Sequence, residues 1–229
     1  MDKKIILLCK TTMFCQYAIK ILESYYSQQD ILCIPSDGKE SLEPLLQDYN
    51  YEYLISFLSP WIIKAALLEK ATKAAINFHP GSPDYPGSGC YNFAIYEKSP
   101  IYGVTCHHMN PQVDTGDIIY TSYFDMAPKE TVETIKLKSM NHLLYLFEKT
   151  INNIYTKDSL PKSDETWRKK PYTMKQFNAM RCVDPKHMSH EEIQLRIRAI
   201  NYHPDHEGVY VQVGNERLVH KFTSKLPIV

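Results

Sequence analysis

Asn77, His79 and Asp114 have side chains and a spacing that suit chemistry on a small ligand. Residues 74–78 read as a strand, and Asn77 and His79 stand at its carboxyl end with one residue between them. Alternate residues of a strand face the same side, so both side chains can meet one ligand. Asp114 lies in a glycine turn, which suits a carboxylate presented to a neighbouring loop. Together these residues offer a neutral donor, a titratable base and a charge partner.

The elements around these residues alternate between strands and helices. Apolar runs predict strands at residues 4–9, 31–34, 53–57, 74–78, 102–107 and 118–124. Apolar residues at helical spacing predict helices at residues 14–22, 40–47, 61–69 and 131–154. We therefore expect an α/β, Rossmann-like fold with a mostly parallel sheet and helices on both faces. Ligands of such sheets bind beyond the carboxyl ends of the strands.

The chain changes character after residue 154. We expect a catalytic domain at residues 1–154 and a C-terminal extension at residues 155–229. Residues 155–186 are polar and irregular, with the basic run Arg168-Lys-Lys170, and are expected to wrap the surface.

The extension is expected to end in a helix and a β-hairpin. A capping box that starts at Ser189 predicts a helix over residues 189–200. Alternating valines before the turn Gly214-Asn215 predict a hairpin over residues 209–222. Since a lone hairpin is only marginally stable, its apolar face predicts a two-fold homodimer.

The composition limits the possible partners and the location. Lysine plus arginine and aspartate plus glutamate both number 26, so no overall positive field gathers nucleic acid or an anionic membrane. The apolar run near the N-terminus is too short for a secretory signal or a membrane span. The six cysteines form no Cys-x-x-Cys pair, which indicates reduced thiols and a cytoplasmic location.

Two segments of the chain resemble one enzyme family. The folate-dependent formyltransferases have a signature that is similar to INFHPGSPDYPGSG and YGVTCHHMNPQVDTGDII. Asn77, His79 and Asp114 match the catalytic residues of that family one for one. This resemblance implies 10-formyltetrahydrofolate as the co-substrate and an oxyanion stabilised by Asn77. It also implies that His79 moves protons while Asp114 orients its ring.

The segment SFLSPWII is similar to the family's loop beside the folate pterin. The folate-binding residues implied by the resemblance are Leu58, Ser59, Trp61, Ile62, Ile63 and Asp114. Trp61 has a second reading, because an aromatic near the start of a helix packs into a core about as often.

Within this family, the loop at residues 80–87, the segment CYNFAIY and the tail IRAINYHPDHEGVYV look most like the sugar N-formyltransferases. That implies an amino sugar linked to a nucleoside diphosphate as acceptor, for example a dTDP-4-amino-4,6-dideoxyhexose. The segment Cys9-Lys-Thr-Thr12 departs from the glycine-rich phosphate turn of glycinamide ribonucleotide formyltransferases. The alternatives are another small amine or methionyl-tRNA as acceptor, or a folate or sugar-nucleotide binding module without turnover.

The candidate acceptor-binding residues are Lys10, Thr11, Thr12, Tyr85 and Arg198. Lys10 and the threonines stand where a strand gives way to a helix, and the helix N-terminus favours a phosphate there. The other reading is that a threonine simply caps this helix.

We expect no metal at the site. His107 and His108 are adjacent on a predicted strand and face opposite ways, so they cannot chelate one ion as neighbours. His203 and His206 have a spacing that could hold a metal, but their stretch reads as a turn.

Overall fold

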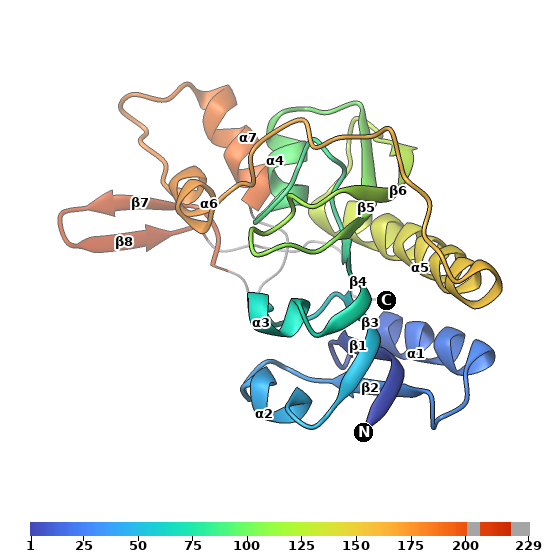
Figure 1. Ribbon diagram of the computed structural model, residues 1–229. Helices are drawn as coiled ribbons and strands as arrows, with labels where there is room; N and C mark the ends of the chain where they lie inside the picture. The colour runs from blue at the N-terminus through green and yellow to red at the C-terminus, as the bar shows by residue number, and fades with distance from the viewer. Residues whose placement is uncertain (201–206, 221–229) are drawn as a thin grey trace. The chain divides into compact units, whose positions relative to one another are not determined.

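The computed structural model describes residues 1–200 and 207–220 (Figure 1). The strands are β1 Asp2–Cys9, β2 Ile31–Pro35, β3 Asn50–Phe57, β4 Ala71–His79, β5 Ile101–His108, β6 Ile118–Asp125, β7 Tyr210–Val213 and β8 Glu216–Val219. The helices are α1 Met13–Tyr25, α2 Leu42–Leu46, α3 Ala65–Leu68, α4 Cys90–Tyr96, α5 Val132–Lys157, α6 Met174–Arg181 and α7 His190–Ile200.

A six-stranded sheet in the order β2-β1-β3-β4-β5-β6 carries the candidate site. Strands β1, β2, β3 and β4 pair in parallel, which confirms the predicted α/β, Rossmann-like fold. β5 pairs antiparallel to β4, so the sheet is mixed at the place where Asn77 and His79 stand. An antiparallel pair needs no crossover helix packed on the sheet, and the short α4 between these strands packs with α7.

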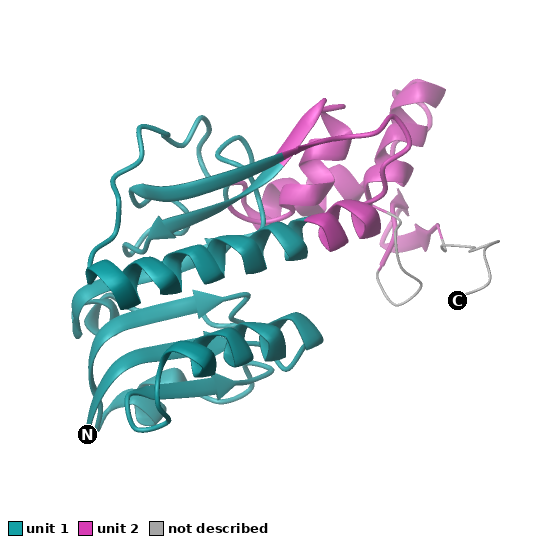
Figure 2. Ribbon diagram, turned by 90° about the vertical axis from the view of Figure 1, so that its right-hand side faces the viewer, with its two compact units in different colours: residues 1–86, 103–123, 139–171 teal, residues 87–102, 124–138, 172–229 magenta. Residues whose placement is uncertain are grey.

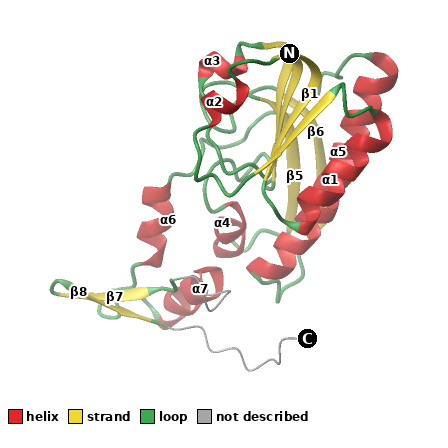
Figure 3. Ribbon diagram, turned by 90° about the horizontal axis from the view of Figure 1, so that it is seen from below, coloured by secondary structure: helices red, strands yellow, loops and turns green. Residues whose placement is uncertain are grey.

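Each face of the sheet is covered by its own pair of helices (Figure 3). Apolar residues of α1 and α5 meet one face, together with Ile76 and Phe78 of β4. Residues of α2 and α3 meet the other face, together with Ala75. Because side chains alternate along a strand, Asn77 and His79 belong to the face that α2 and α3 cover. Asn77 and His79 thus lie on the same face as the apolar Ala75, at the end of the strand.

The chain forms two compact units (Figure 2). The first comprises residues 1–86, 103–123 and 139–171, and it contains the candidate site. The second comprises residues 87–102, 124–138 and 172–229. These units are defined by compactness, whereas the boundary at residue 154 concerns which part of the chain carries catalysis. That boundary stays a prediction.

Two helices differ from the sequence-based expectation. The helix predicted at residues 61–69 is reduced to α3, Ala65–Leu68, because Lys64 before it has extended backbone angles, φ −73° and ψ 152°. α6 lies inside the segment predicted to be irregular. A capping box formed by Thr173 and Gln176 starts it, and this pattern was readable in the sequence.

The predicted C-terminal elements are present in the second unit. α7 begins after Ser189, whose hydroxyl accepts from the Glu192 amide, 3.1 Å away. β7 and β8 form the predicted hairpin around Gly214 and Asn215, and Gly214 has the positive φ of 57° that this turn requires. Phe222, the predicted end of the hairpin, lies outside the described residues.

Within residues 1–200 and 207–220, no helix is long and apolar enough to cross a membrane. All six cysteines lie in these ranges and are free thiols.

Candidate active site

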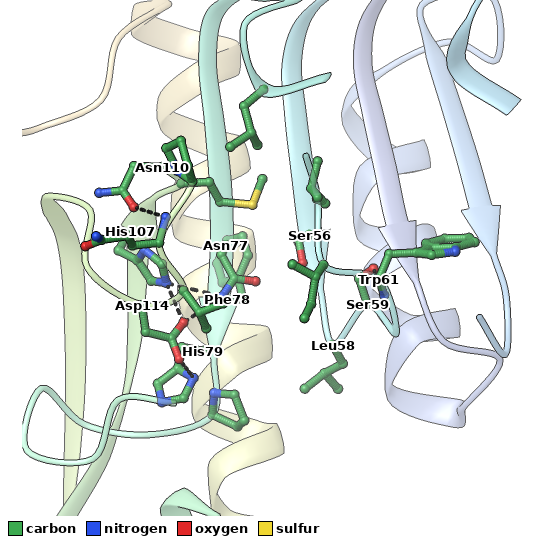
Figure 4. A pocket seen from close by; sticks show the side chains of 18 of the residues that line it. Ser56, Leu58, Ser59, Trp61, Asn77, Phe78, His79, His107, Asn110 and Asp114 are labelled. Carbon is green, nitrogen blue, oxygen red and sulfur yellow. Dashed lines mark hydrogen bonds and ion pairs between the residues drawn. The ribbon is translucent and has the colours of Figure 1, made fainter. Parts of the chain in front are cut away.

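Asn77, His79 and Asp114 come together at one wall of a cleft in the first unit (Figure 4). Nδ1 of His79 lies 3.1 Å from Oδ2 of Asp114. Nδ2 of Asn77 lies 3.4 Å from Oδ1 of the same carboxylate. The side chains of His79 and Asp114 are each 5% exposed, so water hardly screens this pair.

Asp114 reaches the histidine through a strained turn. Its φ of 48° is left-handed, a region that aspartate tolerates better than most residues. Gly116 follows in the same turn, and a Cβ there would lie 1.8 Å from the backbone oxygen of His108. The turn can therefore pack against β5 only because residue 116 has no side chain.

A second histidine, His107, completes the hydrogen-bonded group. Its Nε2 lies 3.2 Å from Oδ1 of Asp114 and 3.2 Å from Nδ2 of Asn77. Its Nδ1 donates to the His108 carbonyl at 2.8 Å, and its side chain is 2% exposed. Alternation along β5 left open whether His107 or His108 faces the cleft. The antiparallel register decides this, because it sets His107 directly opposite Asn77.

His108 has a different environment from its neighbour. Burial lowers the pKa of His108, so this ring is kept neutral near pH 7. Of the two adjacent histidines, it is His107 that contacts Asp114.

His79 has oxygen acceptors at both ring nitrogens. Nε2 donates to the backbone carbonyl of Tyr85 at 2.9 Å, while Nδ1 faces Asp114. A carbonyl oxygen can only accept, so Nε2 carries the proton of this hydrogen bond. Tyr85, a candidate for acceptor binding, thus meets His79 through its main chain. Its side chain is buried, with Nζ of Lys169 4.9 Å from the ring centre.

Trp167 is a further neighbour that the sequence reasoning missed. Its ring meets those of His107 and His79 edge-on, with centroids 5.1 and 6.0 Å away. Its Nε1 donates to the Gly116 carbonyl at 2.8 Å. Residue 167 lies in a polar, irregular segment far along the chain, so no local pattern pointed to it.

The cleft itself has a volume of about 300 Å³. The residues predicted to bind folate all line it, namely Leu58, Ser59, Trp61, Ile62, Ile63 and Asp114. Ile62 is 81% exposed, and Leu58 has a left-handed φ of 53°. The Trp61 indole points away from His79 and donates to the Glu40 carbonyl at 2.9 Å (Figure 4). Trp61 thus fits both readings in part, since it lines the cleft and also packs against the apolar cluster that includes Leu42 and Leu46 of α2.

The other candidates for acceptor binding lie in varied surroundings. Lys10 lines the cleft. Thr11 donates to Oδ1 of Asp37 at 3.0 Å, and Thr12, which precedes α1, donates to Sγ of Cys15 at 3.2 Å. Arg198 lies in the second unit, where its guanidinium donates to the carbonyls of Pro128 and Glu130. Lys10 is therefore the candidate cation on the cleft wall.

Within residues 1–200 and 207–220, no group of three or more histidine, cysteine, aspartate or glutamate side chains could hold a metal ion. His203 and His206 lie outside the described residues.

Comparisons with known proteins identify the family of the chain. The family described as Formyl transferase matches residues 21–146. A methionyl-tRNA formyltransferase from Rickettsia rickettsii (strain Iowa) is 26% identical over 173 residues, which cover 75% of this chain and 55% of that protein. The chain thus spans about half the length of this relative.

Solved structures match over more of their length. A 4-N formyltransferase from Francisella tularensis has a TM-score of 0.76 at 20% identity, over 98% of this chain and 99% of that one. An N-formyltransferase from Helicobacter canadensis, in complex with folinic acid and dTDP-3-aminofucose, has a TM-score of 0.69 at 19% identity, over 86% of this chain and 80% of that one. At this identity the likeness shows a shared fold.

Proposed function

The chain belongs to the formyl transferase family, and from this premise we propose that it moves a formyl group from 10-formyltetrahydrofolate to the amine of an amino sugar linked to a nucleoside diphosphate. The observation that carries the proposal is the buried pair of His79 and Asp114 with Asn77 beside it on the cleft wall. A module that only binds a ligand has no need of a titratable pair shielded from water.

Each of these residues has a role in the proposed reaction. Attack of the amine on the formyl carbon builds negative charge on the formyl oxygen, and the carboxamide of Asn77 donates to it. The amine must lose a proton and the departing folate nitrogen must gain one, and His79 serves both needs. Asp114 orients the His79 ring and supports its charged form. The reaction needs neither a metal nor a covalent intermediate.

The wall at residues 58–63 suits a flat, largely apolar ring such as the pterin. It offers apolar side chains, the exposed Ile62 among them, and the main chain beside the left-handed Leu58. The acceptor amine approaches from the other side of His79. Lys10 lines the same cleft and offers a positive charge there.

A nucleotide-linked amino sugar is favoured over tRNA as the acceptor. The fold match to a 4-N formyltransferase spans 98% of this chain. It therefore extends beyond the family match to α6, α7 and the hairpin. Equal numbers of acidic and basic residues, 26 of each, argue against a surface built to hold tRNA.

The decisive experiment measures tetrahydrofolate release by absorbance while amino sugars linked to thymidine, uridine or guanosine diphosphate are offered in turn. We expect turnover with one base class and a formamide product in the mass spectrum. Methionyl-tRNA and a free amino sugar serve as rival acceptors. Folate binding without tetrahydrofolate release for any acceptor would favour the non-catalytic module.

In this proposal the protein acts in the cytoplasm as a homodimer. Two side chains of the hairpin, Val213 and Leu218, are 54% and 60% exposed, which leaves an apolar face for a second copy. Light scattering at micromolar concentration tests this point. A mass of one chain would contradict the dimer, and a dimer that survives deletion from Gly208 onward would place the interface elsewhere.

A further inference from the structure

The segment Glu165–Lys169, which we call the strap, contacts His79, His107 and the loop at residues 80–87. Trp167 of the strap meets His79 and His107 edge-on and bonds to the Gly116 carbonyl, two residues after Asp114. One indole ring therefore touches both histidines and the turn that carries their shared carboxylate.

Arg168 ties the strap to the loop on which His79 depends. Its backbone amide donates to the Pro83 carbonyl at 3.0 Å, and its guanidinium pairs with Oδ2 of Asp84 at 2.8 Å. The guanidinium also pairs with Oε2 of Glu165 at 2.7 Å. With carboxylates on two sides, its charge is already balanced within the chain. That arrangement suits a clamp better than a ligand for pyrophosphate.

The loop held by Arg168 also contains Tyr85, whose carbonyl bonds to His79. The Tyr85 carbonyl accepts from Nε2 of His79 at 2.9 Å, one residue after Asp84. The next strap residue, Lys169, lies over the Tyr85 ring. The strap thus braces the His79 ring at its edge through Trp167 and, through the loop, at Nε2.

We propose that the strap positions His79, with Trp167 fixing the ring orientation and the pair Arg168–Asp84 holding the Tyr85 carbonyl against Nε2. This inference rests on the proposed function and adds positioning residues to it. For His79 to accept a proton through Nε2 it must leave the Tyr85 carbonyl, so the strap also governs how easily that nitrogen becomes available.

The first test replaces Trp167. Trp167→Ala should lower kcat about tenfold, because small displacements of a proton-transfer group are costly, with KM for the folate donor nearly unchanged. Trp167→Phe keeps the ring contact and loses the bond to Gly116, so it should recover most of kcat. The control for aromatic loss is Tyr17→Ala on α1, where the side chain is 46% exposed. A shared loss of melting temperature and kcat in both Trp167 variants would reduce the role to folding and overturn the proposal.

The second test is a double-mutant cycle on the clamp. Arg168→Gln and Asp84→Asn should each lower kcat about threefold, and the double variant should lose no more than either alone. Melting temperatures should hardly change, since the pair is half-exposed. The matched control is Glu191→Gln on α7, which breaks an exposed ion pair with Lys98. If Arg168→Gln raised KM for the acceptor while Asp84→Asn did nothing, Arg168 would be a substrate ligand and the clamp would be refuted.

The third test does not use activity. The chain has two tryptophans, so Trp61→Phe leaves Trp167 as the single indole fluorophore. Indole emission depends on the groups that the ring contacts, so His79→Asn should change the emission of Trp167. Unchanged emission would overturn the contact itself, whereas changed emission in a protein without turnover would count against the proposed function alone.

Discussion

The two walls of the cleft differ in how firmly their side chains are held in the protein without a ligand. On one wall, His79, His107 and Asp114 are at most 5% exposed, and both histidines contact the Asp114 carboxylate. On the opposite wall, Ile62 is 81% exposed and the Trp61 indole turns away toward Glu40. Polar groups that must act on charge are fixed in advance, since reorganising them during the reaction would cost free energy. An apolar wall can adjust, because its contacts are non-directional.

The largest effect should come from removing the charge that both histidines share. Asp114→Asn keeps the left-handed backbone, which asparagine also tolerates, and so isolates the carboxylate. We expect kcat to fall at least about a hundredfold. Binding of a stable folate analogue should change little, because the turn at Asp114 is expected to contact folate through its main chain. Steady-state kinetics and calorimetry measure the two quantities. Near-normal turnover would show that the wall with His79, His107 and Asp114 does not carry the reaction.

The second prediction concerns the other proposed catalytic side chains. His79→Asn should lower kcat by at least about a hundredfold through lost proton transfer. Asn77→Ala should cost a comparable factor through the lost oxyanion donor, about a hundredfold or more. Circular dichroism and melting curves should stay close to those of the parent protein. Persistence of activity in His79→Asn would exclude the mechanism.

The third prediction uses two adjacent histidines on opposite faces of the sheet. His107→Asn should lower kcat about tenfold, because Asp114 and Asn77 lose a shared neighbour. His108→Gln serves as the matched control and should leave kcat within about twofold. Equal losses in the two variants would mean that the register of β4 and β5 does not determine which histidine matters.

Changes in the wall at residues 58–63 should alter the affinity for folate. Trp61→Ala combined with Ile62→Ala should weaken binding of a folate analogue about tenfold, because apolar surface is lost. Turnover at saturation should change little. Isothermal titration gives the Kd, and an unchanged value would move the pterin pocket to another part of the cleft.

The smallest expected effect is on acid stability. Burial lowers the pKa of both His108 and His142, so the unfolded chain binds more protons at these rings than the folded one. The free energy of unfolding should therefore fall as pH drops through the unfolded value near 6.5, and it should be regained above that value. Melting temperatures from pH 8 to about 5 test this, with His142→Gln expected to flatten the slope. A slope of opposite sign would contradict the burial of these rings.

Local pattern predicted most of the sheet. Apolar runs and helical spacing located β1 to β6, α1 and α5, because each of these elements buries a face whose period is visible in the sequence. The same reasoning overextended α3 and overlooked α6, although Thr173 and Gln176 carried a readable capping box. The antiparallel pairing of β4 with β5 was not predictable, because it depends on where the chain returns to the sheet.

The candidate site divides in the same way. Asn77, His79 and Asp114 were predictable from the sequence alone, since their residue types, their motif and their place at a strand end all pointed to one ligand. The tertiary structure alone selected His107 over His108, through the register opposite Asn77, and brought Trp167 and the Tyr85 carbonyl to the histidine rings. The physical reason is that alternation along a strand is a local property. Contacts between segments distant in sequence arise only when the whole core has packed.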